Sequence, residues 1–110
     1  MRPPHALEWI DGIETDFVDL ATVDPRLVGI ARAIALDVAN HHRHGKALGR
    51  RNISGDLSGF YRLSFDVPEQ RVQRFRLIYD RPDDSTIRIV GLGEREGSAV
   101  YRALAQRLGN

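Results

Sequence analysis

The chain has 110 residues, of which 42% are hydrophobic and 28% charged, and its formal net charge is only +1. This size and this balance predict one globular domain over residues 1–110, with a single modest core. The absence of cysteine excludes disulfides and thiolate metal sites, and no long apolar run suggests a signal peptide or a membrane span, so we expect a cytoplasmic protein that does not contact membranes.

The N-terminal half is predicted to contain a short strand and a helical hairpin. The stretch HALEWID (5–11) is typical of a strand. A helix over 13–23 and a longer helix over 24–45 follow, with Asp24 as the cap of the second and Gly45 as its stop. One apolar stripe runs along the longer helix, made by Leu27, Ile30, Ala31, Ile34, Ala35 and Val38.

The C-terminal half is predicted to consist mainly of strands. A connection rich in glycine and arginine (45–59) leads into three strand-like runs with turn sequences between them, which cover 60–66, 71–80 and 85–92. A closing helix begins near Gly97 or Ser98, and its expected buried residues are Val100, Ala103, Leu104 and Leu108. These elements predict an α+β fold of two layers, in which the first strand and the helical hairpin pack on a mainly antiparallel four-stranded sheet.

Alternation along the three runs separates an apolar face from a face rich in arginine. The apolar face, expected to pack on helices, carries Tyr61, Leu63, Phe65, Phe75, Leu77, Tyr79, Ile87 and Ile89. The opposite face carries Arg62, Ser64, Arg74, Arg76 and Arg88. Such a face can simply be the solvated side of a sheet, but arginines in the middle of neighbouring strands repel one another unless an anion is bound.

The basic residues are concentrated late in the chain and are almost all arginine. Residues 1–40 carry three basic against seven acidic residues, a net −4, and residues 41–110 carry thirteen against eight, a net +5. A guanidinium can hold a phosphate through two hydrogen bonds, although a general preference for arginine codons also accounts for this composition. If RNA is the partner, the expected contacts are Ser64, Arg74 and Arg88 on the strands and Lys46, Arg50 and Arg51 in the connection.

Two other motifs are weaker candidates for a site. His41, His42 and His44 suggest a metal, but His41 and His42 would point about 100° apart on a helix, and no carboxylate lies at ligand spacing. The stretch GLGEREG (91–97) lacks the G-x-G-x-x-G pattern of a nucleotide-binding loop. We therefore predict neither a metal nor another cofactor.

Four residues suit phosphoryl chemistry on RNA. Arg62 and Arg76 lie in the middle of strands, and Arg95 lies in the turn after the last strand. Tyr101 lies one turn into the closing helix, and an antiparallel sheet can bring all four to one concave surface. Arginines neutralise charge on the phosphate and a phenol or guanidinium passes the proton, while the 2′-hydroxyl of the RNA is the nucleophile.

The order of the elements and three stretches of sequence resemble the RelE/ParE toxin superfamily of bacterial toxin–antitoxin systems. The stretches are GFYRLSF, FRLIYD and GEREGSAVYRALAQRL, and the last is similar to the closing motif of RelE-like toxins. The resemblance covers the chain from Gly59 onward by motif and most of the chain by the order of elements. It implies a ribosome-dependent endoribonuclease (an mRNA interferase) that cleaves mRNA in the A site by attack of the 2′-hydroxyl on the adjacent phosphate.

The resemblance also implies roles for individual residues. Arg95 and Tyr101 match the closing arginine and tyrosine of the family. Arg76 matches an arginine in the second of the three strand-like runs, and Arg62, in the first run, stands where the family has a lysine. Tyr101 would orient or deprotonate the 2′-hydroxyl, and Arg95 would donate to the leaving 5′-oxygen or stabilise the phosphate. Arg76 and Arg62 would hold the charge of the phosphate.

One departure from the family pattern bears on activity. Ser64 stands where the family has a second basic residue, which implies weaker activity or a compensating charge, with Arg74 as the nearest candidate. The implied partners are a cognate antitoxin, in a possible toxin–antitoxin hetero-oligomer, and the ribosome with its mRNA, including contacts to 16S ribosomal RNA.

Two alternatives to the nuclease remain open. The ParE branch shares the fold and inhibits DNA gyrase by binding, without catalysis, and generally lacks the arginine and tyrosine pairing. A degenerate member of the superfamily would serve only as an interaction module. Convergence of the four phosphoryl-chemistry residues on one surface is the expectation that favours the nuclease.

Overall fold

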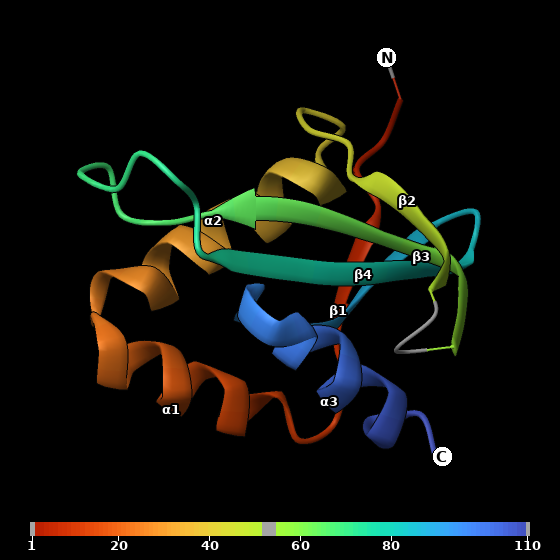
Figure 1. Ribbon diagram of the computed structural model, residues 1–110. Coiled ribbons are helices and arrows are strands. Elements are labelled where there is room, and N and C mark those ends of the chain that lie inside the picture. The colour runs from red at the N-terminus through yellow and green to blue at the C-terminus, as the bar shows by residue number, and fades with distance from the viewer. Residues whose placement is uncertain (1, 52–54, 110) are drawn as a thin grey trace.

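The computed structural model describes residues 2–51 and 55–109 (Figure 1). For residues 50, 51, 55 and 56 it describes the backbone but not the side chains. The elements in chain order are β1 (Ala6–Trp9), α1 (Ile13–Val23), α2 (Arg26–Ala39), β2 (Lys46–Arg51), β3 (Gly55–Phe65), β4 (Phe75–Asp83), β5 (Thr86–Glu94), a 3-10 turn (Glu96–Ser98) and α3 (Ala99–Arg107). The strand order is β1-β5-β4-β3-β2, in which β1 runs parallel to β5 and the other neighbours are antiparallel. Among the described residues, no helix has the length and apolar character needed to cross a bilayer.

The α+β class is confirmed, and the sheet has five strands rather than the predicted four. The additional strand is β2, which lies in the segment 45–59 that we predicted to be a connection. Its register with β3 shifts between Ala47 and Gly49, and Gly49 has a φ of 65°, so the strand bends at this point. The glycines favoured a loop locally, but backbone pairing with β3 overrides that preference.

The second helix of the hairpin ends earlier than predicted. α2 ends at Ala39 rather than at residue 45, because Asn40 leaves the helical conformation and His41 has a left-handed φ of 64°. The N–H of His42 then donates to the carbonyl of Asp37 at 2.8 Å. The three neighbouring histidines therefore lie beyond the helix, and their expected helical spacing does not apply.

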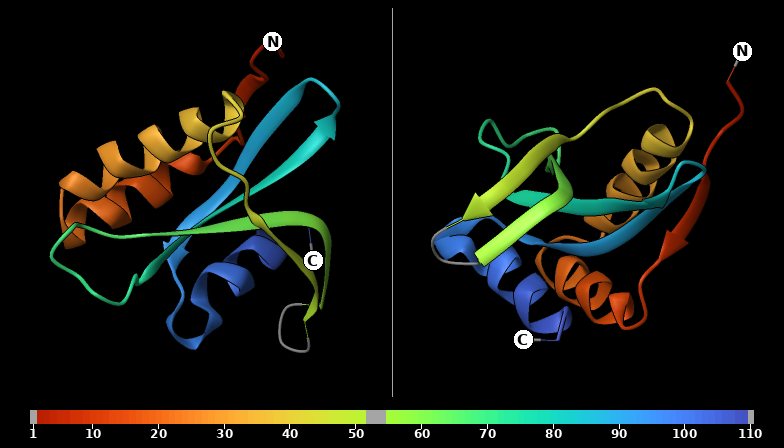
Figure 2. Two further views of the ribbon diagram at one scale, coloured as in Figure 1. Left: turned by 90° about the horizontal axis from the view of Figure 1, so that it is seen from above. Right: turned by 90° about the vertical axis from the view of Figure 1, so that its right-hand side faces the viewer.

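α1 and α2 cover one face of the sheet (Figure 2, left). The large apolar cluster lies between these two helices and the sheet, and its strand members are Leu63, Phe65, Phe75, Leu77, Tyr79, Ile87, Ile89 and Leu92. Tyr61 packs against the same cluster. The apolar face predicted from alternation is therefore confirmed on all three strands.

α3 packs on the opposite face of the sheet (Figure 2, left). A second, smaller cluster fills this contact, made by Leu48, Leu57, Ile78, Val90, Val100, Tyr101 and Leu104. The sheet thus has a helical layer on each side at this end, which the predicted two layers did not include, and the core has two parts rather than one.

The packed side of α3 differs from the predicted one. Val100 and Leu104 are buried as expected, and Tyr101 is buried with them. Gly93 of β5 allows this close approach, since a Cβ at that position would lie 3.4 Å from the side chain of Val100. Two residues predicted to be buried are exposed: Ala103 and Leu108.

A buried carboxylate fixes the loop between β3 and β4. The side chain of Asp66 is shielded from solvent and accepts hydrogen bonds from the Arg74 guanidinium at 2.8 and 3.0 Å. It also accepts from the backbone N–H groups of Val67 and Arg74 at 2.7 and 3.0 Å. The hydrogen bonds from the Arg74 guanidinium, and to a smaller degree those backbone donors, hold the pKa of Asp66 at about 2 against the opposing effect of burial. Farther along the loop, Glu69 pairs with Arg26 of α2 at 2.6 Å.

Replacing Asp66 with asparagine is expected to lower the free energy of unfolding at neutral pH by about 2 kcal/mol, since each unit by which the folded-state pKa is depressed contributes about 1.4 kcal/mol. The folded-state pKa lies below the ordinary value of 3.8, so this stabilisation is complete above about pH 5 and is lost as the pH falls toward 2. Denaturant unfolding of both proteins at several pH values checks the prediction. A difference between the two proteins that stays constant down to about pH 2.5 would contradict it.

Candidate functional site

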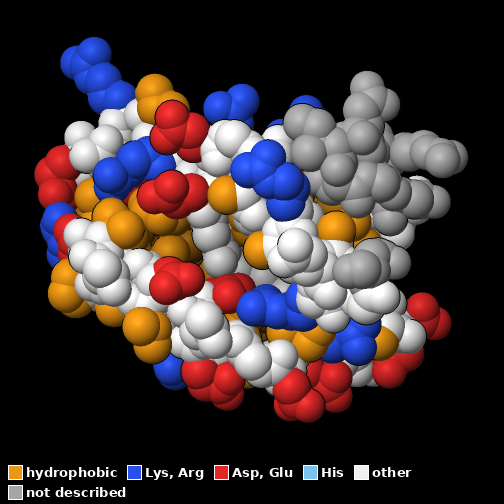
Figure 3. Space-filling view, turned by 60° about the horizontal axis from the view of Figure 1, so that its bottom comes forward, with side chains coloured by type: hydrophobic (Ala, Val, Ile, Leu, Met, Phe, Trp, Pro, Cys, Tyr) orange, Lys and Arg blue, Asp and Glu red, His pale blue; other side chains and the backbone are white. Residues whose placement is uncertain are grey.

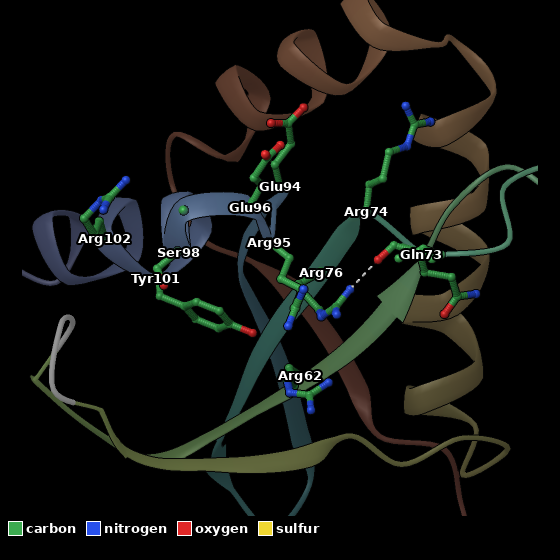
Figure 4. A pocket seen from close by; sticks show the side chains of 12 residues that line it. Arg62, Gln73, Arg74, Arg76, Glu94, Arg95, Glu96, Ser98, Tyr101 and Arg102 are labelled. Carbon is green, nitrogen blue, oxygen red and sulfur yellow. Dashed lines mark hydrogen bonds between the residues drawn. The ribbon is translucent and has the colours of Figure 1, made fainter.

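A cleft of about 900 Å³ lies between the β3–β4 loop, the arginine face of the sheet and the start of α3 (Figure 4). Its lining residues are Arg62, Val72, Gln73, Arg74, Arg76, Glu94, Arg95, Glu96, Gly97, Ser98, Tyr101 and Arg102. The four residues predicted for phosphoryl chemistry all belong to this set. The structure therefore brings together residues that are up to 39 positions apart in the sequence, while their chemical roles remain predictions.

Arg76 lies deepest among the arginines of the cleft. Its side chain extends from β4, and the residue is only 9% exposed. One terminal nitrogen donates to the backbone carbonyls of Gln73 and Phe75, both at 2.9 Å, while the buried Nε has no hydrogen-bond partner among the described residues. Burial lowers the pKa of Arg76 from its ordinary value; the Tyr101 hydroxyl opposes this, and the positive charges of Arg62 and Arg95 add to it.

Arg62 and Arg76 share a face of the sheet but do not lie directly opposite each other. In the register of β3 and β4, Arg62 pairs with Ile78, and Arg76 pairs with Ser64. The two guanidinium groups therefore approach diagonally, which reduces the cross-strand repulsion expected from the sequence. In Figure 4 the hydroxyl end of Tyr101 points toward the side of the cleft on which Arg62, Arg76 and Arg95 lie.

The turn after β5 places Arg95 and Tyr101 on the same cleft. The N–H of Arg95 donates to the carbonyl of Arg74 at 2.8 Å, and the carbonyl of Arg95 accepts from the N–H of Ser98 at 3.0 Å. Gly97 and Ser98 both have left-handed φ values, of 62° and 60°, and this reversal starts α3. Tyr101 then lies in the first turn of α3, 4% exposed, with its ring in the smaller apolar cluster.

The other residues predicted to contact RNA do not all lie at the cleft. Arg74 lines the cleft, but its charge is compensated by Asp66. Arg88 lies outside the cleft and pairs with Asp80 at 2.6 Å. The remaining residues are Ser64, which faces Arg76 across the strands without lining the cleft, Lys46, which is exposed on β2, and Arg50 and Arg51, whose side chains lie outside the described ones.

Sequence reasoning did not assign several residues that line the cleft. Val72 and Gln73 lie on the loop that Asp66 fixes, and no sequence pattern indicated that this loop folds over the arginine face. Glu94 and Glu96 flank Arg95 in the sequence and add two acidic side chains to the lining. Arg102 directly follows Tyr101 in the sequence, and this adjacency was the only signal that could have placed Arg102 at the cleft.

The charge of the cleft differs from that of the neighbouring surface. Five arginines and two glutamates line the cleft. On the face that α1 and α3 form, acidic and basic side chains are interspersed (Figure 3). Uncompensated positive charge is thus concentrated where Tyr101 presents a hydroxyl, an arrangement suited to binding an oxyanion and to moving a proton next to it.

None of the four histidines lines the cleft, and two of them, His5 and His41, contact each other. The Nε2 atom of His41 is 2.8 Å from the carbonyl oxygen of Pro3, and its ring contacts the ring of His5 with centroids 4.5 Å apart. Within the described part of the chain, no group of three or more potential metal ligands is placed to hold an ion.

Pyrophosphate is expected to stabilise the protein through the cleft, because the arginines there lack sufficient acidic partners. A ligand at ten times its Kd raises the free energy of unfolding by about 1.4 kcal/mol. Arg62→Gln should reduce this gain, whereas Arg43→Gln, a change at an exposed arginine away from the cleft, should leave it unchanged. Thermal unfolding with and without pyrophosphate measures the effect, and equal gains in all three proteins would rule out the cleft as the binding site.

No family model matches the chain, and no curated protein matches it in sequence. A solved structure of similar fold is the crystal structure of the toxin–antitoxin complex RelBE2 from Mycobacterium tuberculosis. The match has a TM-score of 0.60 at 23% sequence identity and covers 86% of this chain and 95% of the matched chain. The chain therefore has a RelE-like toxin fold, as the resemblance of its sequence implied.

Proposed function

We propose that this chain is the toxin of a type II toxin–antitoxin system and acts in the cytoplasm as a ribosome-dependent endoribonuclease. The observation that carries the proposal is the shared cleft of Arg62, Arg76, Arg95 and Tyr101 on a RelE-like fold. Neither the fold nor the basic face would suffice alone, because related folds can host different activities. The combination of a phenol with uncompensated guanidinium groups supports phosphoryl chemistry rather than binding alone.

The proposed reaction needs no group from outside the RNA and the protein. The 2′-oxygen of the RNA forms a bond to the adjacent phosphorus while the bond from phosphorus to the 5′-oxygen breaks. The products are a 2′,3′-cyclic phosphate and a 5′-hydroxyl. Tyr101 orients the 2′-hydroxyl or takes its proton, and Arg95 donates a proton or a hydrogen bond to the leaving 5′-oxygen.

Arg76 and Arg62 stabilise the charge that builds on the phosphate. Arg76 is buried and held by two backbone carbonyls, so its guanidinium is in position before the substrate arrives. Its unpartnered Nε leaves one donor available for a phosphate oxygen. Burial weakens the solvation of this charge. An anion bound in the cleft would therefore offset the free-energy cost of keeping the Arg76 guanidinium charged.

The proposed partners follow from the same charges. An acidic segment of a cognate antitoxin can cover the cleft and compensate its arginines, which would block access of RNA. The solved structure of similar fold is itself a toxin–antitoxin complex. On the ribosome, phosphates of the mRNA and of 16S ribosomal RNA would bind the arginines that the antitoxin otherwise covers.

Cleavage of a translated message is expected to require Arg95 and Tyr101. The wild type and a Tyr101→Phe, Arg95→Ala double variant are induced, and 5′ ends are mapped on a translated message and on an untranslated copy. Cuts should appear in the translated message only and fall by at least about 100-fold in the double variant, because a general acid or base contributes about 10²–10⁴ to the rate. Arg43→Ala, at an exposed arginine that does not line the cleft, should cut like the wild type.

Other outcomes would move the protein to a different class. Cuts that persist in the double variant would remove Arg95 and Tyr101 from the reaction. Growth arrest with gyrase-linked DNA breaks and no RNA cuts would indicate a ParE-like toxin. Neither effect would indicate an interaction module with a toxin's fold.

A further inference from the structure

We infer that Arg102 binds a second phosphate of the RNA, next to the reacting one, and so directs the strand over the first turn of α3. This inference rests on the proposed function, because it assumes that RNA occupies the cleft. It adds a subsite outside the group formed by Arg62, Arg76, Arg95 and Tyr101.

The first support is that the arginines lining the cleft differ in whether other residues already bind their guanidinium groups. Arg74 is compensated by the buried carboxylate of Asp66, and Arg76 donates to two carbonyls inside the cleft. No described residue forms a hydrogen bond or an ion pair with the guanidinium of Arg102. Arg102 is also exposed, so its charge is accessible to a ligand in the cleft.

The second support is the position of Arg102 relative to the reacting group. Figure 4 shows Arg102 on the side of Tyr101 that faces away from Arg76 and Arg62. A terminal nitrogen of Arg102 lies 3.6 Å from the position that a Cβ on Gly97 would occupy, so the guanidinium lies over the turn that starts α3. The phosphate that Arg102 can reach is therefore not the one that contacts Arg76.

The third support is that one part of the rim, between Arg102 and Arg74, is acidic (Figure 4). Glu94 and Glu96 line the cleft and point together away from Arg62 and Tyr101 (Figure 4). A polyanion is repelled from two neighbouring carboxylates, since like charges in contact raise its free energy. A strand that leaves the reacting group therefore passes over Arg102, where the positive end of the α3 dipole adds to the attraction.

The inference can be tested with short single-stranded RNA that binds but is not cut. A 2′-O-methyl group blocks the attacking hydroxyl, and a methylphosphonate linkage removes the charge of one phosphate at a time. The proteins are the wild type, Arg102→Gln and Arg43→Gln, and Kd is measured by fluorescence anisotropy over a range of salt concentrations.

One flanking methylphosphonate should weaken binding by the wild type by about three-fold, as expected for an exposed charge pair. The same linkage should have no effect on Arg102→Gln, which should bind unmodified RNA about three-fold more weakly than the wild type does. The slope of log Kd against log salt should become shallower by about 0.7 in Arg102→Gln, because one phosphate contact is lost. Arg43→Gln should behave like the wild type.

Two results would overturn the inference. One is a flanking methylphosphonate that weakens wild type and Arg102→Gln equally, and the other is absence of RNA binding by the wild type at low salt. Cleavage on ribosomes is measured separately, so the two proposals fail independently. If RNA binding depends on Arg102 but no cleavage occurs, the subsite stands and the nuclease proposal is rejected. If Arg102→Gln lowers kcat and leaves KM unchanged, Arg102 acts in the chemical step and the subsite is rejected.

Discussion

The burial of one positive charge, on Arg76, constrains the architecture around the cleft. A buried guanidinium needs hydrogen-bond acceptors, and two of them are backbone carbonyls at the end of the β3–β4 loop. That loop must therefore hold a fixed position, which the Asp66–Arg74 pair provides. The hydroxyl of Tyr101 also faces this charge, so α3 must dock on the sheet for the environment of Arg76 to be complete.

Much of the fold could be predicted because its signals are local. The alternation of Leu63 and Phe65 with Arg62 is enough to define two faces, and the stripe on α2 defines a packing surface. β2 could not be predicted in this way. Its sequence is rich in glycine, which favours a loop, and it becomes a strand only by pairing with β3. Leu92 could not be predicted either, because it joins the face covered by α1 and α2 only through the register shift of β4 and β5 next to Val90.

In the candidate site, too, the features with local sequence signals could be predicted, and those that depend on tertiary contacts could not. The residue types in the closing motif indicated which side chains to place together, and strand alternation put Arg62 and Arg76 on one face. What the sequence did not indicate is which arginines are compensated. Arg74 and Arg88 each pair with an aspartate eight positions earlier, a distance that becomes a contact only when a hairpin forms between the two. Charge counted along the sequence therefore overestimates the charge that a ligand meets.

The contact between the two ends of the chain has a consequence for the order of folding. Asp16 of α1 accepts hydrogen bonds from Arg107 of α3 at 2.8 and 3.0 Å and from the N–H of Leu92 at 2.9 Å, and Asp16 and Arg107 are 91 positions apart. Contacts of such long sequence separation form late, because a large loop must close before they contribute. A molecule that has formed its helical hairpin and paired β3, β4 and β5, but has not yet docked α3, lacks the part of the cleft lining that α3 supplies. Folding itself thus delays the moment at which the cleft is complete.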